Sequence, residues 1–323
     1  MTNSPDALHH FLFQKKLDDQ LNRLTPIRGN LVHLNQTFML AMQHQTLPNV
    51  LKQALGELMA ASALLSATLK MEGALVLQLQ SKGALKLLVV ECSQDLDLKL
   101  HLRATAKWDE TLTKEIENYN FVDLVKHGQF VITLDPNIGE PYQGIVPIEG
   151  ETIAHMLQNY MLRSQQIDTS LWLHCDGESA SGMLLQKLPN IGELDADAWN
   201  RVNILADTVT NDELQNLAPE TLLTRLFAEE DVRLFEAKPT QFRCSCSKTK
   251  VGNMLRLLGA DEVNSILAEQ AKIQGATQAV IQVNCDFCNK HYSFDAIDVA
   301  QILLDPAQIL ASSDGIKPSV AKH

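Results

Sequence analysis

The sequence predicts an α+β protein with a mixed, largely antiparallel sheet and packed helices in its N-terminal part, then a helical linker, then a small cysteine-rich domain. Three observations support this prediction. Helix and strand periodicities alternate through the first part, a purely helical stretch follows, and four of the six cysteines gather in the last quarter. We divide the 323 residues into a core domain at 1–190, a linker at 191–238, a cysteine domain at 239–304 and a tail at 305–323.

A helix predicted at residues 51–70 has one apolar stripe. Its leucines recur at three-to-four-residue spacing, which is typical of a helix that faces a core. They are Leu51, Leu55, Leu58, Leu65 and Leu69. The most apolar stretch, 58–69, is too short to span a bilayer, which needs about 20 residues. We therefore expect a buried helix and no membrane partner.

Strand patterns follow this helix. Residues 74–80 and 85–91 flank a short turn that contains Gly83, which predicts a hairpin. Residues 96–103 alternate leucines with charged or histidine side chains, so we expect a strand with one dry face and one wet face.

Two further strands, 129–134 and 169–175, are predicted on either side of a helix. The apolar face of that helix consists of Ile153, Met156, Leu157 and Tyr160. The core domain should end near Pro189, before the pattern becomes purely helical.

The linker pattern runs from about residue 192 to residue 235. One apolar stripe consists of Trp199, Val202, Ala206 and Val209. Thr210 and Glu213 have the spacing of a capping box, and Pro219 is placed to start another helix. The last helix, predicted at 221–235, carries both apolar residues and an acidic run. This segment is either a helix hairpin between domains or a segment that can open and expose its apolar side.

The paired cysteines predict a metal site or a dithiol switch. The pairs are Cys244 with Cys246 and Cys285 with Cys288, and 38 residues (247–284) separate them. Four thiolates from two short turns are the ligands that tetrahedral Zn²⁺ prefers. A helix is predicted at 251–271 and strands at 278–283 and 292–294, a unit too small for a core of its own without metal. We therefore predict a zinc-binding domain that holds one Zn²⁺.

Positive side chains lie close to both pairs and should favour thiolate over thiol. They are Arg243, Lys248, Lys250, Lys290 and His291. A disulfide across one intervening residue closes a small, strained ring, and such bonds are labile. His291 could replace one thiolate as a ligand, but four cysteines already suffice. Cys92 and Cys175 lie in strand patterns and are expected to be core thiols.

The charge balance bears on partners and location. The net charge is −12, yet the region from Pro239 onward has eight basic and eight acidic residues, so the excess lies in the first 238 residues. An acidic body with a neutral cysteine region is a poor match for nucleic acid. The N-terminus lacks a basic start followed by an apolar run, so we expect a cytoplasmic protein with reduced thiols.

Two alternatives to a dithiol switch follow from the residues. A zinc-ribbon nucleic-acid-binding module is disfavoured by the charge. A thiol oxidoreductase using Cys285 and Cys288 is disfavoured because that motif normally begins a helix after the first strand of a βαβ unit. No GxxxxGK[ST] motif occurs, so ATP-driven work has no support.

Several segments resemble the redox-regulated chaperone family of thirty-three-kilodalton heat-shock proteins. In the C-terminal half they are Phe242-Arg-Cys-Ser-Cys-Ser, residues 283–294 and residues 226–235. In the N-terminal half they are Glu57-Leu-Met-Ala-Ala-Ser, Leu88-Val-Val-Glu91, Pro141-Tyr-Gln-Gly144 and residues 182–189. The resemblance runs nearly end to end and is more specific than the cysteines alone.

The resemblance implies a bacterial holdase, which is a non-enzymatic chaperone that needs no ATP. It implies that the reduced protein is inactive and binds Zn²⁺ through the four cysteines. Oxidants would form the disulfides Cys244–Cys246 and Cys285–Cys288 and release the zinc, after which the linker unfolds. The active protein would bind unfolded or oxidatively damaged clients and form a homodimer.

The spacer between the pairs is longer than is typical of the family. The surplus lies around residues 272–282, just before the second pair. An extension there leaves the ligands intact. The chain also continues past the cysteine domain, and from Asp314 that tail is expected to be disordered.

Overall fold

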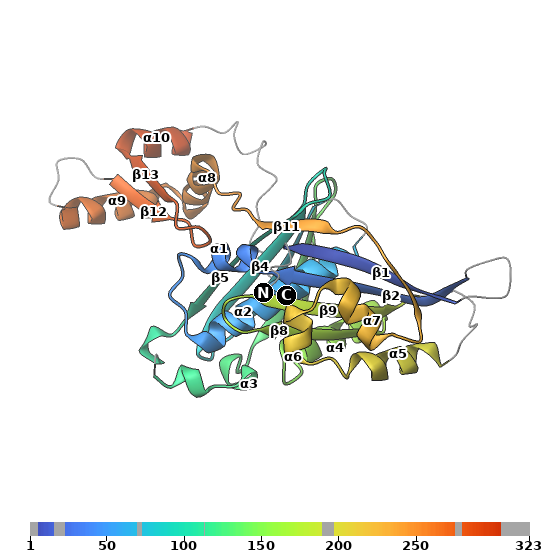
Figure 1. Ribbon diagram of the computed structural model, residues 1–323. Coiled ribbons are helices and arrows are strands. Elements are labelled where there is room, and N and C mark those ends of the chain that lie inside the picture. The colour runs from blue at the N-terminus through green and yellow to red at the C-terminus, as the bar shows by residue number, and fades with distance from the viewer. Residues whose placement is uncertain are drawn as a thin grey trace. The chain divides into compact units, whose positions relative to one another are not determined.

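The computed structural model describes residues 6–15, 23–69, 73–112, 114–188, 197–274 and 280–304. These residues divide into two compact units, Met1–Arg243 and Cys244–His323. The first unit contains a large sheet (Figure 1). The second contains the paired cysteines. The finer division into core, linker and tail stays a prediction.

The first unit is built on a sheet of 11 strands in the described part of the chain. The strands are β1 (Ala7–Lys15), β2 (Arg23–Leu34), β3 (Gly73–Gln80), β4 (Leu85–Gln94), β5 (Leu100–Trp108), β6 (Gln129–Pro136), β7 (Tyr142–Pro147), β8 (Thr169–Cys175), β9 (Ala180–Lys187), β10 (Asp231–Leu234) and β11 (Lys238–Phe242). Their order is β7-β6-β3-β4-β5-β11-β1-β2-β9-β8, and β10 also pairs with β1. Only the β11–β5 pairing is parallel among these ladders, which confirms a mixed, largely antiparallel sheet.

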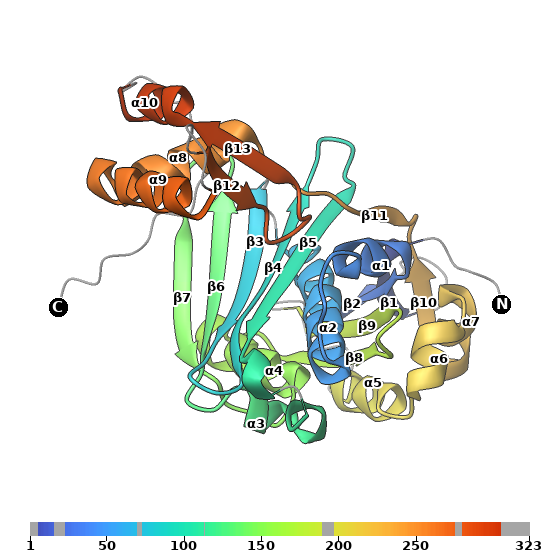
Figure 2. The same ribbon diagram turned by 90° about the vertical axis from the view of Figure 1, so that its left-hand side faces the viewer.

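The helices of the first unit cover this sheet. They are α1 (Gln36–Met42), α2 (Asn49–Ser66), α3 (Phe121–Leu124), α4 (Ile153–Gln165), α5 (Ala198–Ala206), α6 (Asn211–Asn216) and α7 (Pro219–Leu226), with short 3₁₀ turns at Glu110–Leu112 and Ile116–Asn118. The predicted apolar face of α4 is buried, and so are Leu51, Leu55, Leu58 and Leu65 of α2. The helix predicted at 51–70 ends at Ser66, so Leu69 lies beyond it and is half-buried. Helix α2 lies beside the sheet and packs against β3, β4 and β5 and also against β2, β8 and β9 (Figure 2). Most of its buried residues belong to the largest core cluster.

Glu57 lies on α2 among buried residues and is itself half-buried. Desolvation raises the pKa of Glu57 from its ordinary value of 4.5 to about 7. Because the folded state then holds this proton more tightly than the unfolded chain, the stabilisation is present below pH 4.5 and is lost as the pH rises through about 7. The difference corresponds to about 3 kcal/mol in the free energy of unfolding.

We expect Glu57→Gln to remove this pH dependence from the first unit. Denaturant unfolding at pH 5 and pH 8 measures it. Buried or half-buried histidines of this unit have lowered pKa values and add stability as the pH rises, so the expected result is a difference: the change from pH 5 to pH 8 should be less favourable in the wild type than in the variant. Glu178→Gln, at an exposed position, is the matched control. Equal pH dependence in the wild type and in Glu57→Gln would contradict the prediction.

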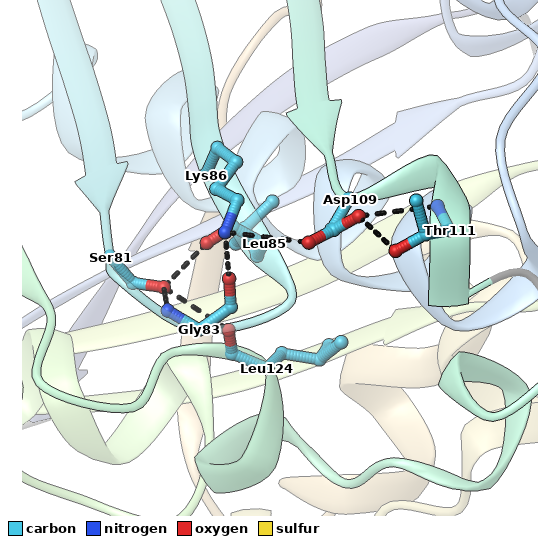
Figure 3. A network of polar contacts seen from close by, with 7 residues as sticks. All are labelled: Ser81, Gly83, Leu85, Lys86, Asp109, Thr111 and Leu124. Carbon is cyan, nitrogen blue, oxygen red and sulfur yellow. Dashed lines mark hydrogen bonds and ion pairs between the residues drawn. The ribbon is translucent and has the colours of Figure 1, made fainter.

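The predicted hairpin of β3 and β4 is confirmed, and a polar network holds its turn (Figure 3). The Ser81 hydroxyl donates to the Leu85 carbonyl (2.5 Å) and accepts from the Gly83 N–H (3.0 Å). Lys86 Nζ donates to the Gly83 carbonyl (2.9 Å) and lies 3.8 Å from an Asp109 carboxylate oxygen. These contacts fix the turn at the position where Gly83 predicted it.

The strand predicted at 96–103 is wrong in its first half, because the strand begins only at Leu100. The Asp95 side chain accepts hydrogen bonds from the N–H groups of Asp97 (3.0 Å) and Lys99 (2.9 Å), and the leucine between them has φ 61°. A side chain that bonds its own backbone in this way favours a turn over a strand. Alternating hydrophobicity alone did not reveal this competition.

The linker helices α5, α6 and α7 are confirmed, including the Thr210–Glu213 capping box and Pro219 in the first turn of α7. They pack on a second core cluster that includes β1, β2 and β9 residues. The helix predicted at 221–235 is wrong beyond Leu226, because residues 231–234 form strand β10. Pairing with β1 satisfies the backbone of this segment and overrides its helical pattern.

The second unit is a β-hairpin surrounded by three helices. Its elements are α8 (Lys248–Leu258), α9 (Ala260–Gln274), β12 (Val280–Asn284), β13 (His291–Asp295) and α10 (Ala296–Leu304). The helix predicted at 251–271 is divided by Gly259, which has φ 88°, and α10 was not predicted. Part of the predicted surplus at 272–282, namely 275–279, and the tail at 305–323 lie outside the described residues.

The core of the second unit is small. Among the residues that the structure describes, its buried hydrophobic residues are Leu255, Val263, Ile281, Tyr292, Phe294 and Val299.

None of the described helices of the chain is long and apolar enough to cross a membrane.

Candidate metal centre

The four paired cysteines come from two places in the second unit. Cys244 and Cys246 precede α8, whose first turn is capped by the Ser247 hydroxyl accepting from the Lys250 N–H (3.1 Å). Because this cap begins the helix directly after Cys246, the first pair lies in the short segment between β11 and α8, which is neither helix nor strand.

The second pair lies in the turn between β12 and β13. The Cys285 N–H donates to the Lys290 carbonyl (3.0 Å), and the Asn289 N–H donates to the Cys285 carbonyl (2.8 Å). Asn289 has φ 56°, a conformation that asparagine tolerates better than most residues. Cys285 and Cys288 therefore lie in a tight hairpin turn and not at the start of a helix, which argues against the oxidoreductase alternative.

The structure brings the four sulfurs together. The Sγ atoms of Cys244, Cys246, Cys285 and Cys288 all lie within 4.8 Å of one another. Two distances join the segments, 3.6 Å from Cys244 to Cys285 and 3.4 Å from Cys246 to Cys288. Ligands about 2.3 Å from a tetrahedral Zn²⁺ are separated by about 3.8 Å. The donor set and its spacing therefore fit a tetrahedral metal ion.

The other candidate ligands lie elsewhere. His291 is exposed, and its Nδ1 contacts the Asn284 side-chain oxygen at 2.8 Å. Cys92 and Cys175 are buried in the first unit, as predicted, and burial raises the pKa of each thiol to about 12. Neither core thiol is therefore suited to ionise.

The environment of the four thiols is uneven. Burial raises the pKa of Cys244 and of Cys288. Burial also opposes ionisation of Cys246, but hydrogen bonds from Tyr292 and from the other cysteines outweigh it and lower the pKa to about 7. Cys246 is thus the thiol among these three that ionises most readily.

Tyr292 was missed as a functional residue in the sequence. Its hydroxyl donates to the Cys246 sulfur at 3.0 Å, whereas the sequence showed only an apolar strand residue. Lys248, which was predicted to favour thiolate, also forms an ion pair with Asp298 at 3.0 Å. The available signal for Tyr292 was its position on the strand that follows the second cysteine pair.

Comparisons with known proteins match most of the chain to one family. Residues 17–295 match the family model described as Hsp33 protein. The 33 kDa chaperonin of Methylobacillus flagellatus is 54% identical over 300 residues, with 92% of this chain and 94% of the relative covered. The 33 kDa chaperonin of Chromobacterium violaceum is 43% identical, with 93% of this chain and 94% of the relative covered. The crystal structure of the 33 kDa chaperonin from Thermotoga maritima has a TM-score of 0.71 at 19% identity, covers 91% of this chain and 97% of that chain, and shows a similar fold.

Proposed function

Because the chain belongs to the Hsp33 family of chaperones, we propose that it is a redox-regulated, ATP-independent holdase. In this proposal the reduced protein is inactive and holds one Zn²⁺ through Cys244, Cys246, Cys285 and Cys288. Oxidation forms disulfides, releases the zinc and unfolds the linker. The protein then binds unfolded or oxidatively damaged proteins as a homodimer. The observation that carries the proposal is the gathering of four sulfurs from two segments in a unit with a small core.

The proposal places the protein in the cytoplasm, where thiols are kept reduced until an oxidant appears. It includes neither a nucleic-acid partner nor a membrane partner, in keeping with the acidic first 238 residues and the neutral cysteine region.

Peroxide oxidises two thiolates to a disulfide in two steps. Bound Zn²⁺ keeps the sulfurs as thiolates and links the two segments. One thiolate attacks peroxide, the O–O bond breaks, and a sulfenic acid and hydroxide form. A second thiolate attacks the sulfenic sulfur and expels hydroxide. Two electrons from the two sulfurs thus reduce one peroxide to two waters, with two protons taken up from solvent.

The pairing of the disulfides decides whether the unit can open. Bonds across the segments, Cys244–Cys285 and Cys246–Cys288, would tie the hairpin to the preceding segment as the metal does. Bonds within each pair, Cys244–Cys246 and Cys285–Cys288, leave the two segments free of each other. We propose the pairing within segments, which is the pairing that the resemblance to the family implies. It would remove the link between the two segments beside a small core.

The linker supplies apolar surface for client binding. Helices α5, α6 and α7 bury residues of the second cluster against the sheet, among them Val202, Leu214 and Leu222. Only Arg243 separates β11 from Cys244, so loss of the metal frees the chain directly after the sheet. Unfolding of the linker would expose both its own apolar face and the sheet residues beneath it.

A peroxide titration of the reduced protein tests the proposal. A metallochromic dye follows zinc release, peptide mass spectrometry assigns the disulfides, and light scattering of an aggregating client measures holdase activity. We expect one zinc released per chain, disulfides within each pair, and suppressed aggregation only after oxidation. Oxidised, zinc-free protein that leaves aggregation unchanged would contradict the holdase function, and disulfides across the segments would contradict the proposed opening.

A further inference from the structure

We propose that Tyr292 is a positioning residue of the metal centre, whose hydroxyl makes Cys246 less reactive toward electrophiles than the sulfur would otherwise be. The proposal rests on the proposed zinc site, because it concerns Cys246 as a metal-bound thiolate. It assigns a role to a residue that is not itself a ligand.

The geometry of the contact is direct. The Tyr292 hydroxyl lies 3.0 Å from the Cys246 sulfur, a short distance for an O–H···S hydrogen bond. The hydroxyl is the donor, since a metal-bound thiolate carries no proton to give. The four sulfurs are therefore not equivalent.

The protein holds the Tyr292 ring in place. Tyr292 is 6% exposed and belongs to the small core of the second unit. Its backbone is opposite Val283 in the β12–β13 ladder, and Lys290 Nζ lies 5.6 Å from the centre of its ring. The ring comes from the strand after the second cysteine pair, whereas Cys246 belongs to the first pair. The hydrogen bond thus joins the two segments independently of the metal.

The consequence for reactivity follows from the charge on sulfur. A hydrogen bond to a thiolate stabilises its lone pairs, so the sulfur donates less charge to a metal and attacks electrophiles more slowly. Partners of this kind orient metal ligands and tune their metal. Cys246 is thereby restrained by a side-chain hydroxyl, whereas Cys244 and Cys288 accept hydrogen bonds from backbone N–H groups.

Tyr292→Phe tests this role, because it removes the hydroxyl and keeps the ring. The zinc-loaded protein is treated with iodoacetamide, in which the thiolate attacks carbon and iodide leaves, and mass spectrometry measures the rate at each cysteine. We expect alkylation of Cys246 to rise roughly three- to eightfold while the other three cysteines change little. Tyr160→Phe is the control, since it removes a hydroxyl in the first unit that accepts from Gln165 (3.2 Å).

Cobalt provides a second measurement on the same variants. With Co²⁺ in place of zinc, the sulfur-to-cobalt charge-transfer band of Tyr292→Phe should move to lower energy, because the sulfur holds its electrons less tightly. The d–d bands should keep their tetrahedral pattern. The control variant should match the wild type in both regions of the spectrum.

The outcomes separate this role from a structural one. Equal acceleration at all four cysteines would mean that the unit has merely loosened, and loss of the tetrahedral d–d bands would mean that the hydroxyl is needed to build the site. Either result, or no change at Cys246, overturns the proposal. If the wild-type protein binds neither zinc nor cobalt, the proposed zinc site itself is contradicted. If it binds metal but Tyr292→Phe leaves the reactivity of Cys246 unchanged, only the proposed role of Tyr292 is contradicted.

Discussion

Cys285→Ala is expected to abolish zinc binding and to unfold the second unit, while the first unit stays folded. The small core described above cannot offset the loss, since structural zinc supplies about 10–16 kcal/mol of apparent binding free energy in zinc-finger peptides. That exceeds or matches the whole stability of a typical domain, about 5–15 kcal/mol. Zinc content and hydrogen exchange of residues 244–304 measure the effect.

The control for this variant is Cys92→Ala, which removes a thiol that hydrogen-bonds Ser66 (3.3 Å) inside the first unit. It should retain one zinc per chain and full protection of the second unit. A Cys285→Ala protein that keeps its zinc and its slow exchange would show that this sulfur is no ligand.

Phe227→Ala is expected to loosen the linker helices without oxidation. Phe227 is 2% exposed, and its ring centre lies 4.9 Å from that of Phe13 and 6.4 Å from that of Phe11. Removing so large a buried side chain typically costs about 3–5 kcal/mol. Because Phe227 directly follows α7, we expect the loss to appear as faster hydrogen exchange over residues 198–227, and the reduced, zinc-bound variant should suppress client aggregation.

Ile204→Ala is the matched control, because Ile204 lies on α5 but is 58% exposed. It should leave both exchange and client binding as in the wild type. Unchanged protection in Phe227→Ala would show that this ring does not anchor the linker. Faster exchange without any client binding would separate linker opening from chaperone activity.

The local sequence pattern was enough to predict elements that are determined by neighbouring residues. The leucine stripe predicted α2, the turn at Gly83 predicted the β3–β4 hairpin, and Thr210 with Glu213 predicted the start of α6. In each case the determining contacts lie within a few residues of one another, so the sequence contains them.

Predictions were wrong in two situations. In one, a contact between residues distant in sequence overrode the local pattern. In the other, a turn interrupted an element that the periodicity would have continued. Residues 231–234 continue a helical pattern but form a strand, because β1 offers an unsatisfied edge more than two hundred residues earlier in the chain. Gly259 interrupts a helix that periodicity alone would continue, since its φ of 88° suits glycine and ends the hydrogen-bond pattern.

The sequence by itself determined the four metal-ligand candidates, because their residue type and close spacing within each pair already specify a soft, tetrahedral donor set. It also determined the α+β class and the family resemblance. Only the tertiary structure decided that the two pairs meet, with all four sulfurs within 4.8 Å, and that Tyr292 reaches Cys246 rather than another sulfur. Those contacts depend on how β12 and β13 pair and where α8 begins, and such distances between segments are set by packing and not by spacing along the chain.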